Sequence, residues 1–200
     1  MHDAMSTPTL NHGRRRALAA LVGTAGLTLG TPWRAAAATQ GDWSALKDGS
    51  IVLFRHANAP GVGDPPGFKL GECRTQRNLD DTGRAQARRI GEQFRQRGIR
   101  VGAVLTSQWC RTRETAELAF PGQVREDPNF NSFFGDRSSE PAQTAAALAT
   151  LTRWRGPGVL VVVTHQVNIS ALTDTGTGSS EGVVVQPADN GLKVLTRLLP

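Results

Sequence analysis

Two histidines and two arginines are the residues of this chain best suited to chemistry, because each lies near the end of an apolar run. Arg55 and His56 directly follow one run, His165 follows a second after a single threonine, and Arg111 lies shortly after a third. An imidazole can act as a nucleophile or move a proton, and guanidinium groups bind the oxygens of a tetrahedral anion in pairs. The group is therefore suited to phosphoryl chemistry. The alternative is that both histidines are core residues with satisfied hydrogen bonds.

The three apolar runs are short and rich in branched residues, which is typical of strands buried on both faces of a sheet. They cover residues 51–54, 101–105 and 159–163. Ligands of open α/β sheets bind beyond the carboxyl ends of the strands. The sequence therefore predicts an α/β sheet with the two histidines and two arginines around one crevice.

Helical spacing and capping residues predict the elements between the strands. A helix is expected from the N-cap Asp80 to about residue 97, and Ser107 is expected to cap a second helix that ends near residue 119. The remaining helices are expected at residues 141–154 and 167–172, an edge strand at 123–126, and a closing hairpin at 182–186 and 192–198.

Two segments between the predicted elements are expected to be loops. Residues 57–72 contain three prolines and four glycines, which makes regular structure improbable and suggests a pocket wall over the first strand's end. Residues 128–139 contain three phenylalanines among polar residues, which predicts a loop with an aromatic floor.

Residues 1–38 have the pattern of a secretory signal peptide. Three consecutive arginines at residues 14–16 precede 14 mostly apolar residues, 17–30, and four alanines follow at residues 35–38. The arginines also resemble those of a twin-arginine signal. We therefore expect residues 39–200 to form the mature domain, in the periplasm or outside the cell. The alternative is an uncleaved membrane anchor, although 14 residues are too few to span a bilayer comfortably.

The charge of the chain does not favour nucleic acid as a partner. The full chain carries a net charge of +6, but the predicted signal holds four arginines and one acid. The remaining residues carry 19 basic and 16 acidic groups, a net charge of +3. Half of the positive charge thus lies in the leader, so a basic protein that adheres to surfaces or nucleic acid is the weaker interpretation.

The two cysteines, Cys73 and Cys110, are expected to form a disulfide if the protein is exported, because an even number of cysteines in an oxidising compartment favours pairing. Two buried thiols are the alternative. No metal site is expected, because the sequence has no CxxC or HxxxH spacing and no cluster of carboxylates.

Several segments, taken in order, resemble the histidine phosphatase superfamily and its phosphoglycerate mutase-like fold. They are Leu-Phe-Arg-His-Ala at residues 53–57, Arg-Asn-Leu-Asp-x-x-Gly at 77–83, Ser-Gln-Trp-Cys-Arg-Thr-Arg-Glu-Thr-Ala at 107–116 and Val-Val-Val-Thr-His at 161–165. The resemblance covers nearly all of residues 50–200. It implies a three-layer sandwich in which helices flank a mostly parallel central sheet.

The resemblance also implies roles for individual residues. His56 would be the nucleophile that forms a phosphohistidine, and His165 the second catalytic histidine. Arg55 and Arg111 would hold the phosphoryl oxygens, and no cofactor is expected. Further substrate contacts are expected from Arg77, Asn78 and Asn168.

The sequence departs from the family pattern at the proton donor for the leaving group. The mutase-like branch has a glutamate where this chain has Asn131, and the acid phosphatase branch has an aspartate where this chain has Gln166. Ala57 also replaces the glycine that usually follows Arg-His. The acids that remain to be considered are Asp136, Glu140 and Glu181. We expect Glu140 to be the donor, although a solvated surface carboxylate is the simpler interpretation of each.

The sequence thus predicts an exported, metal-independent phosphomonoesterase that acts on a small-molecule or envelope phosphate ester. It has no nucleic-acid partner, and no membrane span remains after signal cleavage. The alternative is a binding protein on the same scaffold that captures phosphate groups without turnover. It is motivated by the loss of both family-type proton donors.

Overall fold

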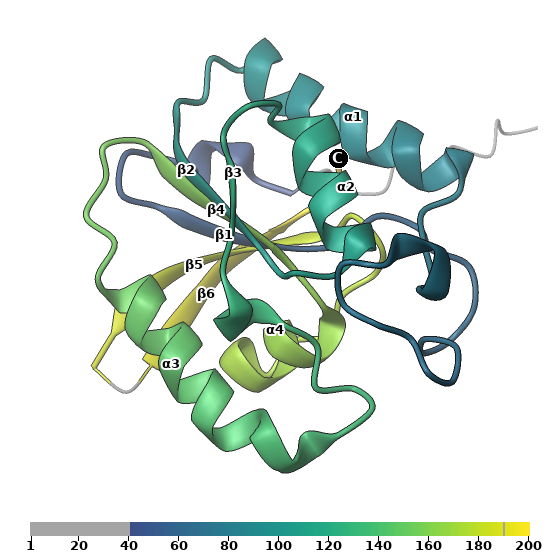
Figure 1. Cartoon of the computed structure of the whole chain (residues 1–200). Coiled ribbons are helices and arrows are strands. Elements are labelled where there is room, and N and C mark those ends of the chain that lie inside the picture. The colour runs from purple at the N-terminus through teal and green to yellow at the C-terminus, as the bar shows by residue number, and fades with distance from the viewer. Residues whose placement is uncertain (1–40, 190) are drawn as a thin grey trace, which may run out of the picture. The chain divides into compact units, whose positions relative to one another are not determined.

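The computed structural model describes residues 41–189 and 191–200, which form a six-stranded sheet with helices on both faces (Figure 1). The predicted signal peptide lies outside the described residues. The strands are β1 Ile51–Arg55, β2 Val101–Thr106, β3 Val124–Glu126, β4 Val159–Thr164, β5 Gly182–Ala188 and β6 Gly191–Leu198. The helices are α1 Asp81–Gln96, α2 Cys110–Ala119, α3 Glu140–Thr152 and α4 Gln166–Thr173. No helix in these ranges is both long and apolar enough to cross a membrane.

The sheet has the strand order β3-β2-β4-β1-β5-β6, with β1 and β4 at its centre. The strands β3, β2, β4 and β1 pair in parallel, whereas β5 pairs with β1 and β6 in antiparallel fashion. The mostly parallel sheet, the short edge strand and the closing hairpin are therefore confirmed.

The sheet lies between two hydrophobic layers, because alternate residues of each central strand face opposite sides. Val52 and Phe54 of β1 pack with Phe94 of α1 in a core that also includes α2. Ile51 and Leu53 face the other way, into a core formed with α3 and α4. Figure 1 shows α1 and α2 on one face and α3 and α4 on the other. This arrangement confirms the three-layer sandwich.

The start of α1 is tied to the loop that follows β1. The Asp80 carboxylate accepts a hydrogen bond from the Gly83 N–H at 2.7 Å, which confirms the expected N-cap. A side chain at Gly83 would place its Cβ 2.1 Å from the Asn58 carbonyl oxygen. Glycine is therefore required here for the close approach of α1 to this loop.

The expected cap of α2 is wrong. The helix begins at Cys110, and Trp109 is the N-cap residue without a side-chain cap. The hydroxyl oxygen of Ser107 accepts from the Trp109 N–H at 3.2 Å and lies 2.8 Å from Nε2 of His165. Ser107 therefore contacts a histidine on a neighbouring element as well as the turn that leads into α2.

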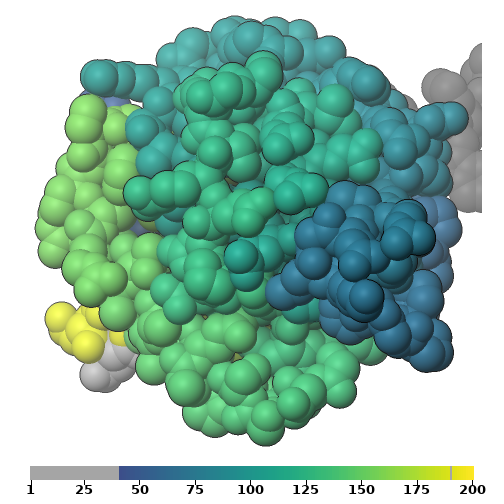
Figure 2. All heavy atoms as spheres, viewed as in Figure 1, coloured from purple at the N-terminus to yellow at the C-terminus, as the bar shows by residue number. Residues whose placement is uncertain are grey.

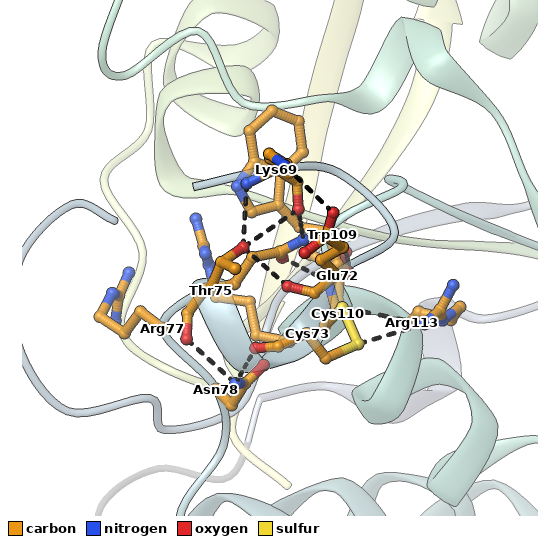
Figure 3. Close-up of a disulfide and its surroundings, with 12 residues drawn as sticks. Lys69, Glu72, Cys73, Thr75, Arg77, Asn78, Trp109, Cys110 and Arg113 are labelled. Carbon is orange, nitrogen blue, oxygen red and sulfur yellow. Dashed lines mark hydrogen bonds and ion pairs between the residues drawn. A yellow bond between two sulfur atoms is a disulfide. The ribbon is translucent and has the colours of Figure 1, made fainter. Parts of the chain in front are cut away.

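A disulfide joins Cys73 to Cys110, so the predicted bridge is confirmed (Figure 3). Cys73 lies just after the loop of residues 57–72, and Cys110 is the first residue of α2. Arg113 of the next turn donates to Sγ of Cys73 at 3.4 Å. The bridge therefore fixes the far end of this loop to the start of α2.

Candidate active site

The register of the two central strands places the two histidines side by side. Arg55, the last residue of β1, pairs with Thr164, the last residue of β4. The His56 N–H donates to the Thr164 carbonyl at 2.9 Å, and the ring centroids of His56 and His165 are 5.6 Å apart. Both histidines are buried. The expectation that they meet at the carboxyl ends of the strands is confirmed.

The hydrogen bond of His56 fixes which of its nitrogens can react. Nδ1 lies 2.8 Å from the carbonyl oxygen of Ala57. A carbonyl only accepts, so Nδ1 carries the proton and Nε2 of the neutral ring keeps a lone pair. The pKa of His56 is lowered to about 3, mainly by burial; the hydrogen bond to Ala57 opposes this shift, and the positive charge of Arg111 adds to it. His56 is therefore a neutral imidazole with a nucleophilic Nε2.

His165 is held from two sides. Its Nε2 lies 2.8 Å from the Ser107 hydroxyl, and its Nδ1 lies 3.5 Å from Nη2 of Arg111. Because a guanidinium only donates, Nδ1 is the acceptor and Nε2–H donates to Ser107. The pKa of His165 lies well below its ordinary value. Burial is the main cause, and the positive charge of Arg111 is the next.

Three arginines line the same cavity as the histidines, and two of them have an unused donor. Nη1 of Arg55 donates to the Thr177 carbonyl at 2.9 Å. Within the described part of the chain, the buried Nε atoms of Arg55 and Arg111 have no hydrogen-bond partner. Buried donors without a partner are costly. An anion bound between these guanidinium groups would satisfy them.

Arg77, the third arginine, holds the loop of residues 57–72. Its Nε donates to the Gly63 carbonyl at 2.8 Å, and its Nη1 donates to the Ala59 carbonyl. Because these bonds occupy two of its guanidinium nitrogens, Arg77 both positions the loop and adds positive charge to the cavity.

Asp64 is the buried carboxylate of the site, and the sequence analysis missed it. Its Oδ1 accepts from Nη1 of Arg111 at 2.8 Å and from the Arg77 N–H at 3.0 Å, and its Oδ2 accepts from Nε1 of Trp109 at 3.0 Å. Burial opposes its charge, but these hydrogen bonds together outweigh burial and lower the pKa of Asp64. It is therefore an ionised residue that positions Arg111.

The cavity has a volume of about 730 Å³. Its walls come from the loop of residues 57–72, the turn before α2, the loop of residues 128–139 and the start of α4. The predicted pocket wall is thus confirmed. Of the three phenylalanines expected to form an aromatic floor, Phe134 lines the cavity, whereas Phe130 and Phe133 are buried and do not. Figure 2 shows the blue surface of the first loop beside the green surface of later segments.

Three of the expected site residues do not line the cavity. Nδ2 of Asn78 donates to the Cys73 carbonyl at 2.6 Å, beside the disulfide (Figure 3). Nδ2 of Asn168 donates to the Asn131 carbonyl at 2.9 Å. Both amides satisfy backbone carbonyl groups. Glu140 forms a 3.4 Å ion pair with Arg137, the residue three positions before it.

The other acids considered as proton donors are also engaged. Asp136 lines the cavity, but its carboxylate accepts from the Ser138 N–H at 2.9 Å, and this hydrogen bond is the main cause of its lowered pKa. Burial opposes the charge of Glu181, but hydrogen bonds from Arg197 and the Gly178 N–H lower its pKa. Asn131 itself is fixed by a 2.8 Å hydrogen bond from the Gln108 N–H.

Sequence reasoning had few ways to find Asp64, Trp109 and Phe68, which all line the cavity. Asp64 and Phe68 lie in a loop without periodicity, so only the prediction of a pocket wall pointed to them. Trp109 directly precedes α2, within the motif that was recognised. Residues 41–189 and 191–200 contain no cluster of three or more His, Cys, Asp or Glu side chains that could hold a metal ion.

Residues 51–147 match the histidine phosphatase superfamily (branch 1). None of the curated protein sequences matches the chain. The fold is similar to that of the protein TTHB049 from Thermus thermophilus, with a TM-score of 0.54, 17% identity, and coverage of 76% of this chain and 99% of that one.

Two further solved structures with this fold are phosphatases by name. The protein histidine phosphatase SixA complexed with tungstate has a TM-score of 0.53 at 18% identity, with 74% of this chain and 96% of that chain covered. The mycobacterial glucosyl-3-phosphoglycerate phosphatase has a TM-score of 0.52 at 16% identity, with 74% and 97% covered. At these identities the likeness shows the fold alone. From the matched segment, the sheet and the paired histidines, the chain belongs to the histidine phosphatase superfamily.

Proposed function

We propose that this protein is a metal-independent phosphomonoesterase whose nucleophile is Nε2 of His56. The observation that carries the proposal is the position of a neutral, correctly protonated His56 beside guanidinium donors of Arg55 and Arg111 that no described residue accepts. A phosphoryl group that accepts these donors is held next to the nucleophile, and their positive charge stabilises the transition state. Because the arginines supply this charge, the proposed step needs no metal ion.

The reaction has two steps. Nε2 of His56 attacks phosphorus, the bond to the leaving oxygen breaks, and that oxygen keeps the electron pair. Water then attacks the phosphohistidine, the N–P bond breaks, and its electron pair returns to Nε2. Over the two steps, a dianionic ester and one water molecule give an alkoxide or phenoxide and one H₂PO₄⁻ ion. Both protons of H₂PO₄⁻ come from the water. His165, which lies against His56, is proposed to contact the transferring group.

Trapping the intermediate tests this proposal. Incubation with a ³²P-labelled phosphomonoester and an alkaline quench should leave label on the protein that is lost in acid, as expected of phosphohistidine. His56→Asn, which keeps a donor for the Ala57 carbonyl, should abolish labelling and turnover. Arg88→Gln, a change on the exposed face of α1, serves as the control and should leave both intact. Full turnover by His56→Asn, or loss of wild-type turnover in EDTA, would contradict the mechanism.

A non-catalytic protein that binds phosphate groups is the second candidate. Asn131 and Gln166 stand where the two family branches have their proton donors, and this observation favours it. It predicts that inorganic phosphate binds to the wild type while a broad ester panel shows neither a burst nor turnover. The labelling experiment therefore separates the two candidates.

We also propose that residues 1–38 direct export and that residues 39–200 act in the periplasm or outside the cell. The arginine and alanine segments support this proposal, as does the disulfide, since such bonds persist in oxidising compartments. Mass spectrometry of the protein from its native host tests it. A new amino terminus close to residue 39 is expected, and an intact leader on a cytoplasmic protein would contradict it.

A further inference from the structure

We propose that the cavity takes aryl phosphates, esters in which the phosphoryl group is carried by a flat aromatic ring. This inference rests on the proposed phosphatase function and names the substrate class of the same site. Two independent features carry it: aromatic side chains that line the cavity beside the histidines, and cavity carboxylates whose oxygens already accept hydrogen bonds from other groups.

The first wall is a row of rings that starts at the proposed reaction centre. The ring centroid of Trp109 lies 5.3 Å from that of His165, with an interplanar angle of 77°. Phe68 continues the row, with a centroid distance of 5.7 Å to Trp109 and an angle of 38°. The Trp109 ring cannot turn freely, because its Nε1–H is bonded to Asp64. An aromatic leaving group would lie along a fixed aromatic surface.

Exposed apolar side chains also line the cavity. Phe134 is 56% exposed and Val62 is 87% exposed, and both line the cavity together with Phe68. A Cβ at Gly63 would lie 3.7 Å from the Phe134 ring, so the two loops approach each other here. Large apolar side chains exposed around one cavity indicate a binding surface for an apolar group. Aromatic rings add specific edge and offset contacts to such a surface.

The acids of the cavity select for leaving groups that depart without a proton. Asp64 and Asp136 are the carboxylates that line it within the described ranges, and the pKa of each is lowered. A phenol has a pKa of about 10, whereas an aliphatic hydroxyl, like water, is roughly six units less acidic. A phenoxide can therefore leave where an alkoxide would need the missing donor.

The test compares values of kcat/KM for four phosphates, chosen to separate the effect of an aromatic ring from the effect of an acidic leaving group. Phenyl phosphate and 1-naphthyl phosphate have rings, acetyl phosphate has an acidic leaving group without a ring, and glycerol 2-phosphate has neither. We expect naphthyl phosphate to exceed glycerol 2-phosphate at least about 100-fold and to exceed phenyl phosphate roughly 3- to 10-fold. Equal values for phenyl phosphate and glycerol 2-phosphate would overturn the inference.

Variants assign the effect to the cavity walls. Phe134→Ala should lower the ratio of naphthyl to acetyl phosphate turnover by roughly 3- to 10-fold. Leu195→Ala is the matched control, since Leu195 is 41% exposed on β6 and does not line the cavity. An unchanged ratio in Phe134→Ala would count against the aromatic wall. If none of the four phosphates were turned over, acetyl phosphate included, the proposed phosphatase function itself would fail, and the aryl inference with it.

A binding measurement gives a second readout that does not need turnover. In isothermal titration calorimetry, phenylphosphonate should bind with a Kd at least about tenfold lower than that of methylphosphonate, and the opposite order would contradict the proposal. Free phosphotyrosine and a phosphotyrosyl peptide distinguish the two sources of an aryl phosphate. Preference for the free amino acid supports a small-molecule substrate, and preference for the peptide supports a protein substrate.

Discussion

Arg111 connects the second histidine of the site to the carboxylate of Asp64. It contacts His165 through Nη2 and Asp64 through Nη1, and its Nε has no partner among the described residues. Lysine would keep the charge but could not present this planar set of donors. The geometry of the guanidinium, and not its charge alone, therefore determines how a phosphoryl group is held.

Arg111→Lys is expected to lower kcat about 100-fold or more, because removal of one positioned donor to a developing negative charge has an effect of about 10²- to 10³-fold. Steady-state kinetics on an aryl phosphate measures this change. Arg113→Lys is the control, since Arg113 lies two residues further along α2, does not line the cavity and pairs with Glu126. A kcat within threefold of the wild type would show that charge alone is sufficient.

The neutral state of His56 links the active site to the stability of the protein. Its pKa is about 3 in the folded state and near 6.5 when unfolded, so between these values the unfolded chain binds more protons. The free energy of unfolding should therefore rise with pH across this window and level off above it. Each such histidine contributes a slope of about 1.4 kcal/mol per pH unit within the window.

Urea unfolding of the wild type and of His56→Asn at pH 4.5, 5.5, 6.5 and 7.5 measures this effect. The variant should show a shallower dependence, by about 1.4 kcal/mol per pH unit below pH 6. His165 contributes in the same direction in both proteins. Parallel curves for the two proteins would mean that His56 does not remain neutral in the folded state.

At the scale of elements, the disulfide sets the position of the loop that carries Asp64 and Phe68. The bridge between Cys73 and Cys110 closes a segment with a sequence separation of 37. In the chain-entropy model this closure stabilises the folded protein by about 4 kcal/mol. The bridge also anchors the loop next to Trp109, which both Asp64 and Phe68 contact.

The double variant Cys73→Ser with Cys110→Ser should therefore lose about 4 kcal/mol in the free energy of unfolding. It should also raise KM for 1-naphthyl phosphate more than for acetyl phosphate, because the aromatic wall is no longer anchored. Wild type under reducing conditions provides the matched comparison. A loss below about 1 kcal/mol with an unchanged KM would show that the loop is held by its hydrogen bonds alone.

The sequence predicted the elements well where local pattern determines them. Short branched runs predicted β1, β2 and β4, and the polar residues that end β1 and β4 pointed to His56 and His165. The cap of α2 was predicted wrongly, because the Ser107 hydroxyl accepts from the Trp109 N–H just before the helix and bonds to a histidine 58 positions away.

Contacts formed in the folded chain also explain why other residues of the site were missed or misplaced. The amides of Asn78 and Asn168 satisfy backbone carbonyls, a role that spacing in the sequence does not reveal. Asp64 joins the site only because the folded loop brings it to Arg111, 47 positions away. No local pattern encodes that distance.

At the scale of the whole described domain, the site is assembled from parts of unequal stability. His56 and His165 extend from the two central strands, whose residues are almost all buried on both faces. Asp64, Phe68 and Phe134 lie on loops at the surface. Backbone amides of β1 and β4 should open only with global unfolding, whereas loop amides should open locally.

Hydrogen exchange measured by mass spectrometry tests this difference. Peptides from residues 51–55 and 159–164 should exchange with a free energy equal to that of global unfolding. Peptides from residues 60–70 and 132–136 should exchange with a much smaller free energy. Uniform protection of all four segments would contradict the proposed difference.

The central position of β1 and β4 also has an evolutionary consequence. The chemistry of the site resides in rigid strands that tolerate little change, while recognition resides in two surface loops that tolerate much more. Directed evolution toward a new phosphate ester should therefore accumulate its substitutions at residues 60–70 and 132–136. The histidines and their strands should stay unaltered while the substrate preference changes.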